Sequence, residues 1–202
     1  MLKKAIQQIR KWIDMGMNPV NISVNQSKIV FYHENYISEL KSLLEEYNVS
    51  GSYITLEVLE STVIEDIDMF NSIFTESVFA ESNTIVKNTI TRFHKKGFYV
   101  LMDDFGSGYS SLNVLSKLQI DELKIDRIFL HTKSEVDNQR TKWILESIID
   151  IAKKSQILVV VEGVESKQDD LFIKNLGADV GQGYFYGRPL SISAFNDLIE
   201  TK

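Results

Sequence analysis

The stretch LMDDFGSGYSSL, residues 101–112, places two adjacent aspartates at the end of an apolar run and follows them with a glycine-rich turn. The apolar residues before the pair, in FYVLMD (98–103), are typical of a buried strand. Neighbouring carboxylates repel each other, and the end of a strand requires no charge pair. Asp103 and Asp104 therefore indicate a site where positive charge binds at the end of a strand.

The same pattern, a helix followed by an apolar strand, recurs on both sides of this stretch. Apolar residues at helical spacing precede the strands, for example in residues 37–47 and 144–151. The predicted strands are residues 21–25, 53–59, 98–103, 122–126, 157–162 and 179–184. Repeated helix–strand units with apolar strands predict an α/β fold with a parallel sheet covered by helices. Both a doubly wound open sheet and a (β/α)8 barrel fit this pattern.

Polar residues at the strand ends distinguish these two folds. Nearly every predicted strand ends in such a residue: Asn25, Glu57, Asp103, Lys124 with Asp126, Glu162 and Gln182. In a barrel of parallel strands the carboxyl ends form one rim that carries the active site, whereas an open sheet concentrates its ligands at one switch point. The distribution favours a TIM-type barrel, although the sequence supplies six strands and a closed barrel needs eight.

Composition excludes several classes of protein. The 202 residues suffice for one domain, and a net charge of −6 disfavours a general DNA- or RNA-binding surface. Without cysteine there is neither a disulfide framework nor a thiolate metal site. The longest aliphatic run, ILVVV at 157–161, is too short to cross a bilayer. We therefore expect a cytoplasmic protein, with any membrane segment lying outside this chain.

The residues at the strand ends suit hard divalent cations. Oxygen donors without cysteine or histidine favour Mg²⁺ or Mn²⁺, and adjacent aspartates can serve two ions at once. The candidate ligands are Asn25, Glu57, Asp103, Asp104 and Glu162. Lys124 could orient an attacking water or neutralise charge on a phosphorus centre. The alternatives are an acidic strand end capped by Asp104 and a salt bridge between Lys124 and Asp126 across the rim.

Two glutamate pairs share one spacing. Glu57 and Glu60 in LEVLE, and Glu162 and Glu165 in VEGVE, are each three residues apart. The first member of each pair is expected to face the mouth of the barrel. The second is expected to hold a neighbouring loop through backbone N–H groups. Gln182, at the end of the last strand, could instead belong to a turn.

Six motifs in order, SVNQS, LEVLES, MDDFGSGYSSL, ELKIDR, VVVEGVES and GQGYFYGRPL, resemble the EAL family of cyclic di-GMP phosphodiesterases. The resemblance runs through nearly the whole chain. It implies a modified TIM barrel that hydrolyses cyclic di-GMP to linear pGpG with two Mg²⁺ or Mn²⁺ ions. It further implies a single domain over residues 1–202, a homodimer, and an upstream sensory or GGDEF domain in a longer protein.

The resemblance also assigns roles to residues. It implies metal binding by the five oxygen ligands named above, with Asp104 and Glu162 also catalytic, and contact between Lys124 and the catalytic water. Asp126 and Gln182 match positions that line the substrate pocket. Glu60 and Glu165 match supporting residues, and Glu60 is expected to steady the loop that contains Phe105, Gly106, Ser107 and Gly108.

The chain also departs from the family pattern. The Glu-Ala-Leu segment is absent, so the domain is expected to be N-terminally incomplete and to lack its first two strands, one metal-binding glutamate and one phosphate-binding arginine. Residues 66–84 read as an insertion. Two functions stay open: a cyclic di-GMP phosphodiesterase in bacterial second-messenger signalling, and a catalytically inactive cyclic di-GMP receptor or protein-interaction module. An unrelated two-metal barrel hydrolase is a third reading.

Overall fold

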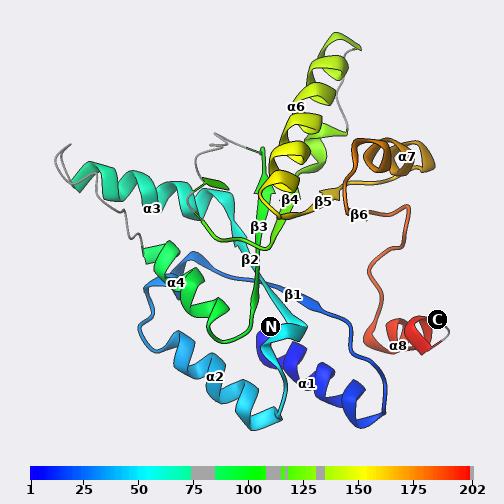
Figure 1. Cartoon of the computed structure of the whole chain (residues 1–202). Helices are drawn as coiled ribbons and strands as arrows, with labels where there is room; N and C mark the ends of the chain where they lie inside the picture. The colour runs from blue at the N-terminus through cyan, green and yellow to red at the C-terminus, as the bar shows by residue number, and fades with distance from the viewer. Residues whose placement is uncertain (74–84, 108–114, 117, 131–134, 201–202) are drawn as a thin grey trace.

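A computed structural model describes residues 1–73, 85–107, 115–116, 118–130 and 135–200. Within these residues six parallel strands form one sheet in which each strand pairs with the next along the chain (Figure 1). The strands are β1 (Ile22–Asn25), β2 (Ile54–Leu59), β3 (Tyr99–Phe105), β4 (Glu122–Ile125), β5 (Leu158–Glu162) and β6 (Val180–Gln182). The sequential order is that of a TIM barrel opened on one side, which confirms the predicted fold class.

Helices connect consecutive strands and cover the sheet. They are α1 (Leu2–Asp14), α2 (Tyr36–Tyr47), α3 (Glu60–Ile73), α4 (Ile85–His94), α6 (Glu135–Lys154), α7 (Lys167–Leu176) and α8 (Ile192–Glu200), with 3-10 turns η1 (Lys28–Tyr32), η2 (Gly51–Tyr53) and η4 (Arg127–Phe129). Local sequence explains their ends. In α7, Ser166 and Asp169 form a reciprocal capping box, and Gly177 ends the helix in the left-handed conformation.

The hydrophobic core lies between the sheet and the helices. β2 is buried along residues 54–58, as expected of a central parallel strand. Phe93 of α4 packs edge-on against Phe31, Tyr36 and Phe98, so aromatic rings join α2 and α4 to the sheet. The two ends of the chain also meet, because α8 lies beside α1 (Figure 1), where Trp12 Nε1 donates to Asn196 Oδ1 at 2.8 Å.

Strand register brings the polar strand ends to one edge of the sheet. Asn25 pairs with Glu57, and Glu162 pairs with Gln182. Between β3 and β4 the register shifts from Met102 to Phe105, so a bulge holds Asp103 and Asp104. The carboxyl edge predicted from the sequence therefore exists as one rim.

The predicted insertion at 66–84 falls partly outside the described residues. Residues 66–73 form the end of α3, while 74–84 lie beyond what the structure describes. At the base of this segment the buried Asp66 accepts the N–H of Val86 at 3.2 Å, which ties α3 to the start of α4. Among the described residues no helix is both long and apolar enough to traverse a bilayer.

Candidate active site at the carboxyl ends of the strands

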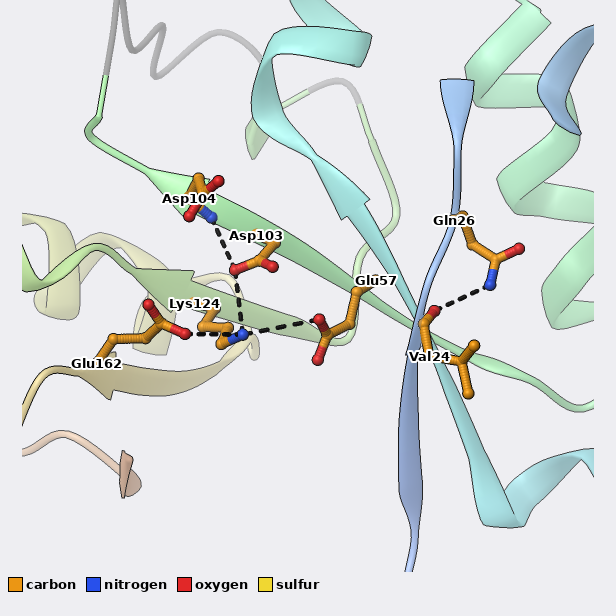
Figure 2. A network of polar contacts seen from close by, with 7 residues as sticks. All are labelled: Val24, Gln26, Glu57, Asp103, Asp104, Lys124 and Glu162. Carbon is orange, nitrogen blue, oxygen red and sulfur yellow. Dashed lines mark hydrogen bonds and ion pairs between the residues drawn. The ribbon is translucent and has the colours of Figure 1, made fainter. Parts of the chain in front are cut away.

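Lys124 lies at the centre of a buried charge cluster on the rim (Figure 2). Its Nζ is 2.8 Å from Glu162 Oε1, 3.2 Å from Asp103 Oδ1 and 3.7 Å from Glu57 Oε2. These four residues come from four consecutive strands, β2 to β5. Only 8% of the Lys124 side chain is exposed, compared with 23% for Glu162. The parallel register thus gathers charges that are far apart in the sequence.

The cluster shifts the pKa values of its members. Burial acts to lower the pKa of Lys124, but the hydrogen bond to Glu162 and the charges of Glu57 and Asp103 outweigh burial and raise it above the ordinary lysine value. Burial raises the pKa of Glu57; Asp103 adds to this effect, while Lys124 and a hydrogen bond from Ser23 oppose it. Lys124 therefore stays protonated at neutral pH and holds the acidic side chains together.

The backbone at the aspartate pair has an uncommon conformation. Asp104 has φ of +59°, in the left-handed region that glycine, asparagine and aspartate adopt more readily than other residues. Its N–H donates to Asp103 Oδ1 at 2.9 Å. Burial and the charge of Asp103 raise the pKa of Asp104. A carboxyl with a raised pKa beside other charged groups is typical of a functional site.

The loop after the pair is fixed from two sides. Gly106 N–H donates to Oε2 of the buried Glu60 at 3.2 Å, which places Glu60 against the loop that we expected it to steady. Gly106 has φ of +96°, and the ring of Phe129 lies where a side chain at this position would be. Ser107 N–H donates to Asp104 O at 3.1 Å, and Phe105 is buried in the core. Gly108 lies outside the described residues.

The remaining candidates lie along the same rim without joining the charge cluster. Asn25 is exposed at the end of the edge strand β1, and Gln182 is exposed at the end of β6. Asp126 is half-buried, and its Oδ1 accepts the N–H of Ile128 at 2.8 Å, which caps η4. Glu165 is exposed, so its surroundings differ from those of the buried Glu60 despite the shared spacing.

Three residues near the site were not singled out by the sequence. Phe129 packs on Gly106, while Gln26 and Tyr36 form a hydrogen-bonded pair behind the end of β1. Gln26 lies directly after Asn25 in SVNQS, but its residue type alone does not indicate that its side chain is buried and hydrogen-bonded. Phe129 and Tyr36 resemble ordinary core aromatics in the sequence.

The carboxylate oxygens of the cluster suit a hard divalent ion, but in this structure they contact the ammonium of Lys124. Carboxylate oxygens from Glu57, Asp103 and Glu162 converge on one point, which is the chemistry that Mg²⁺ and Mn²⁺ require. The ammonium of Lys124 lies at that point. Within the described ranges, no three acidic or histidine side chains are arranged to hold a metal ion as they stand, and this includes the three carboxylates around Lys124. The residue types present fit a two-metal site. For an ion to bind, the carboxylates would have to release the Lys124 ammonium and contact the ion in its place.

Comparison with known proteins supplies further evidence. The family model described as EAL domain matches residues 1–189. The bifunctional diguanylate cyclase/cyclic di-GMP phosphodiesterase MucR of Pseudomonas aeruginosa is 31% identical over 189 residues, which are 94% of this chain and 25% of that protein. The chain spans about a quarter of the length of the curated relatives it matches.

Solved structures agree with this result. The EAL domain of Mycobacterium smegmatis DcpA superposes with a TM-score of 0.81 at 25% identity, over 99% of this chain and 82% of that one. The phosphodiesterase PaMucR, solved in complex with cyclic di-GMP, gives a TM-score of 0.79 at 30% identity, over 96% of this chain and 71% of that one.

Proposed function

Because this chain belongs to the EAL domain family, we propose that it hydrolyses one phosphodiester bond of cyclic di-GMP to give linear pGpG in bacterial second-messenger signalling. The observation that carries this proposal is the buried cluster in which Glu57, Asp103 and Glu162 meet at Lys124. The proposal is supported by MucR, a relative named as a cyclic di-GMP phosphodiesterase.

Five residues with side-chain oxygens would hold two Mg²⁺ or Mn²⁺ ions in this proposal. The ligands are Asn25, Glu57, Asp103, Asp104 and Glu162. Bound ions would supply positive charge that acidifies a water molecule and neutralises charge developing on the phosphate. The bulge at Asp103–Asp104 presents two consecutive carboxylates at the rim, where a regular strand would direct them to opposite faces.

Lys124 orients the attacking water in this proposal, and residues near it on the rim bind the substrate. The Lys124 ammonium carries three donors, and its raised pKa keeps it charged, so it orients the attacking water and stabilises negative charge on the phosphate oxygens. Asp126, directly after β4, and Gln182, at the end of β6, contact the substrate along the same rim. Glu60 keeps the 105–107 loop in place through Gly106 N–H. Glu165, although exposed, is proposed to support the loop after β5.

One observation favours a second candidate function, a receptor that binds cyclic di-GMP without cleaving it or an interaction module. The Lys124 ammonium lies among the carboxylates that the enzyme would need for its ions. A site whose carboxylates already pair with an ammonium can bind a nucleotide through backbone and side-chain hydrogen bonds while metal loading stays weak. Turnover separates the two functions.

The test is an assay of the 202-residue protein with cyclic di-GMP and either Mg²⁺ or Mn²⁺. Formation of pGpG is followed by chromatography beside a binding titration by calorimetry. Asp103→Asn is expected to abolish turnover. The matched control is Asp150→Asn, an exposed aspartate on α6, which should leave turnover unchanged. Binding without turnover in either metal would establish the receptor, and absence of both would overturn the phosphodiesterase and the receptor alike.

The assembly of the protein belongs to the same proposal. We expect a homodimer, a cytoplasmic location, and sensory or GGDEF domains in a longer polypeptide. The relatives, which are about four times the length of this chain, support the expectation of further domains. Sedimentation velocity at micromolar concentration tests the dimer, since a single monomer boundary would contradict it.

A further inference from the structure

Gln26 forms a buried polar contact directly behind the proposed site. It follows the last residue of β1, and only 6% of it is exposed. Its backbone N–H donates to Glu57 O at 2.8 Å, and its side-chain Nε2 donates to Val24 O at 2.9 Å (Figure 2). Its Oε1 accepts the hydroxyl of Tyr36 on α2. The side-chain amide is thus bonded through both its oxygen and its nitrogen.

This contact lies on the opposite face of β1 from the catalytic residues. Side chains alternate along a strand, so Val24 and Gln26 face the helices, while Ser23 and Asn25 face the rim side. The burial pattern agrees, because Val24 and Gln26 are buried and Asn25 is exposed. Ser23 acts to lower the pKa of Glu57, which is consistent with a place on the site side of the strand.

β1 is a short strand with few backbone hydrogen bonds to hold its register. It has four residues, lies at the edge of the sheet and pairs within the described residues with β2 alone. Short edge strands open locally at low free-energy cost. A small movement of β1 would displace Asn25 and Ser23 relative to Glu57.

We infer that Gln26 and Tyr36 are positioning residues that fix the end of β1 and thereby align Asn25 and Ser23 with Glu57 for metal binding, an inference that rests on the proposed function. The pair acts through the backbone. The Tyr36 hydroxyl holds the Gln26 amide, which in turn holds Val24 O, and the Gln26 N–H extends the β1–β2 ladder to Glu57 O. Burial raises the pKa of Tyr36 to about 12, so the hydroxyl keeps its proton and donates at physiological pH.

The packing of Tyr36 makes a mild variant available. Its ring lies 6.3 Å from that of Phe93 in an edge-on arrangement, and phenylalanine preserves this contact. Tyr36→Phe therefore removes the hydroxyl alone. Tyr47→Phe is a matched control from the same helix, because the Tyr47 hydroxyl is also partly buried and accepts from Gln7 Nε2 at 3.0 Å, which joins α2 to α1 instead of to the site.

The experiment measures Mn²⁺ affinity of the full chain by calorimetry, with Mn²⁺ alone as the probe. Direct supporting partners of metal ligands change affinity by roughly 10–100-fold, and this contact is one layer further away, so we expect Tyr36→Phe to weaken Mn²⁺ binding about 3–10-fold. Tyr47→Phe should stay within about twofold of the wild type. Because Tyr36 acts through Gln26, adding Tyr36→Phe to Gln26→Leu should cause no further loss.

Equal effects of the two tyrosine variants on Mn²⁺ affinity would overturn the inference, as would additive effects of Tyr36→Phe and Gln26→Leu. Hydrogen exchange of the backbone amides, measured by NMR, distinguishes failure of the positioning inference from failure of the proposed function. If the wild type binds no Mn²⁺, the proposed metal site fails, and alignment is then tested by exchange alone. The Gln26 N–H should exchange faster in Tyr36→Phe than in Tyr47→Phe, and equal rates would overturn the positioning role.

Discussion

Replacing Lys124 by methionine removes the ammonium at the centre of the charge cluster and keeps an unbranched side chain of similar length. Glu57, Asp103 and Glu162 would then lie close together with no cation between them. Because burial limits how well water can screen them, we expect the folded protein to lose stability at neutral pH. The measured quantity is the free energy of unfolding.

The magnitude follows from the distances. At an effective dielectric constant of about 20, the contact at 2.8 Å attracts by roughly 6 kcal/mol and the one at 3.7 Å by roughly 4.5 kcal/mol. Much of this attraction is offset by removal of the charges from water. Deleting one partner of a buried ion pair typically costs about 3–5 kcal/mol, and we expect Lys124→Met to fall in that range at neutral pH.

The loss should depend on pH. Burial already raises the pKa of Glu57, and Lys124 opposes that rise, so the variant raises this pKa further. A carboxyl with a raised pKa takes up a proton in the folded state before it does so in the unfolded state, which stabilises the fold as pH falls. The deficit of the variant should therefore shrink between neutral pH and about pH 5.

Urea unfolding followed by circular dichroism provides the assay. The control is Lys154→Met, which removes a pair between Nζ and Asp150 Oδ2 at 2.7 Å on the exposed surface of α6. Exposed pairs contribute about 0–1 kcal/mol, so the control should change little. A Lys124→Met loss no greater than that of the control would refute the reasoning that the buried cluster depends on its central ammonium.

Three further variants test the site and its surroundings. Asp104→Asn keeps a residue type that tolerates φ of +59° and removes a carboxylate whose pKa is raised by burial. The variant should therefore be as stable as the wild type in urea unfolding but inactive, and a clear loss of stability would contradict this. Gly106→Ala should lose roughly 1–3 kcal/mol in urea unfolding, more than Gly16→Ala, because both have positive φ but only Gly106 has an aromatic ring against it. The hydroxyl of Tyr186 and the ammonium of Lys174 both lower the pKa of Asp170. Tyr186→Phe removes the first of these contacts, so the melting temperature of the variant should fall below that of the wild type by an amount that shrinks as pH drops below about 4. A difference in melting temperature that does not change with pH would argue against this contact.

The sequence predicted the fold because the signals in this chain are periodic and local. Apolar strands at regular intervals specify a parallel sheet, and all six predicted strands exist. The ends differ where tertiary packing decides them. β3 runs on to Phe105 because the bulge lets that residue pair with Ile125. β6 ends at Gln182, two residues early, because Gly183 packs directly against the backbone of Val164.

Interactions within the site were harder to predict, because they join side chains from different strands. Lys124 had two readings in the sequence, a water-orienting group or a partner of Asp126, and the structure pairs it with three carboxylates other than Asp126. The shared spacing of the two glutamate pairs suggested equivalent surroundings. Glu60 is buried and accepts the N–H of Gly106 in the loop after β3, whereas Glu165 is exposed, a difference that the shared spacing does not reveal.

The charge of the cluster connects its stability to its proposed chemistry. One ammonium against three carboxylates leaves a net negative charge at a buried point, so Lys124 satisfies the site only in part and an incoming divalent cation is still attracted. That cation competes with Lys124 for the same oxygens. The interaction that stabilises the ion-free protein therefore opposes metal loading, and Lys124→Met should bind Mn²⁺ more tightly than the wild type while being less stable without it. Calorimetry on the two proteins decides the point, because equal Mn²⁺ affinities would mean that the ammonium and the ion occupy separate positions.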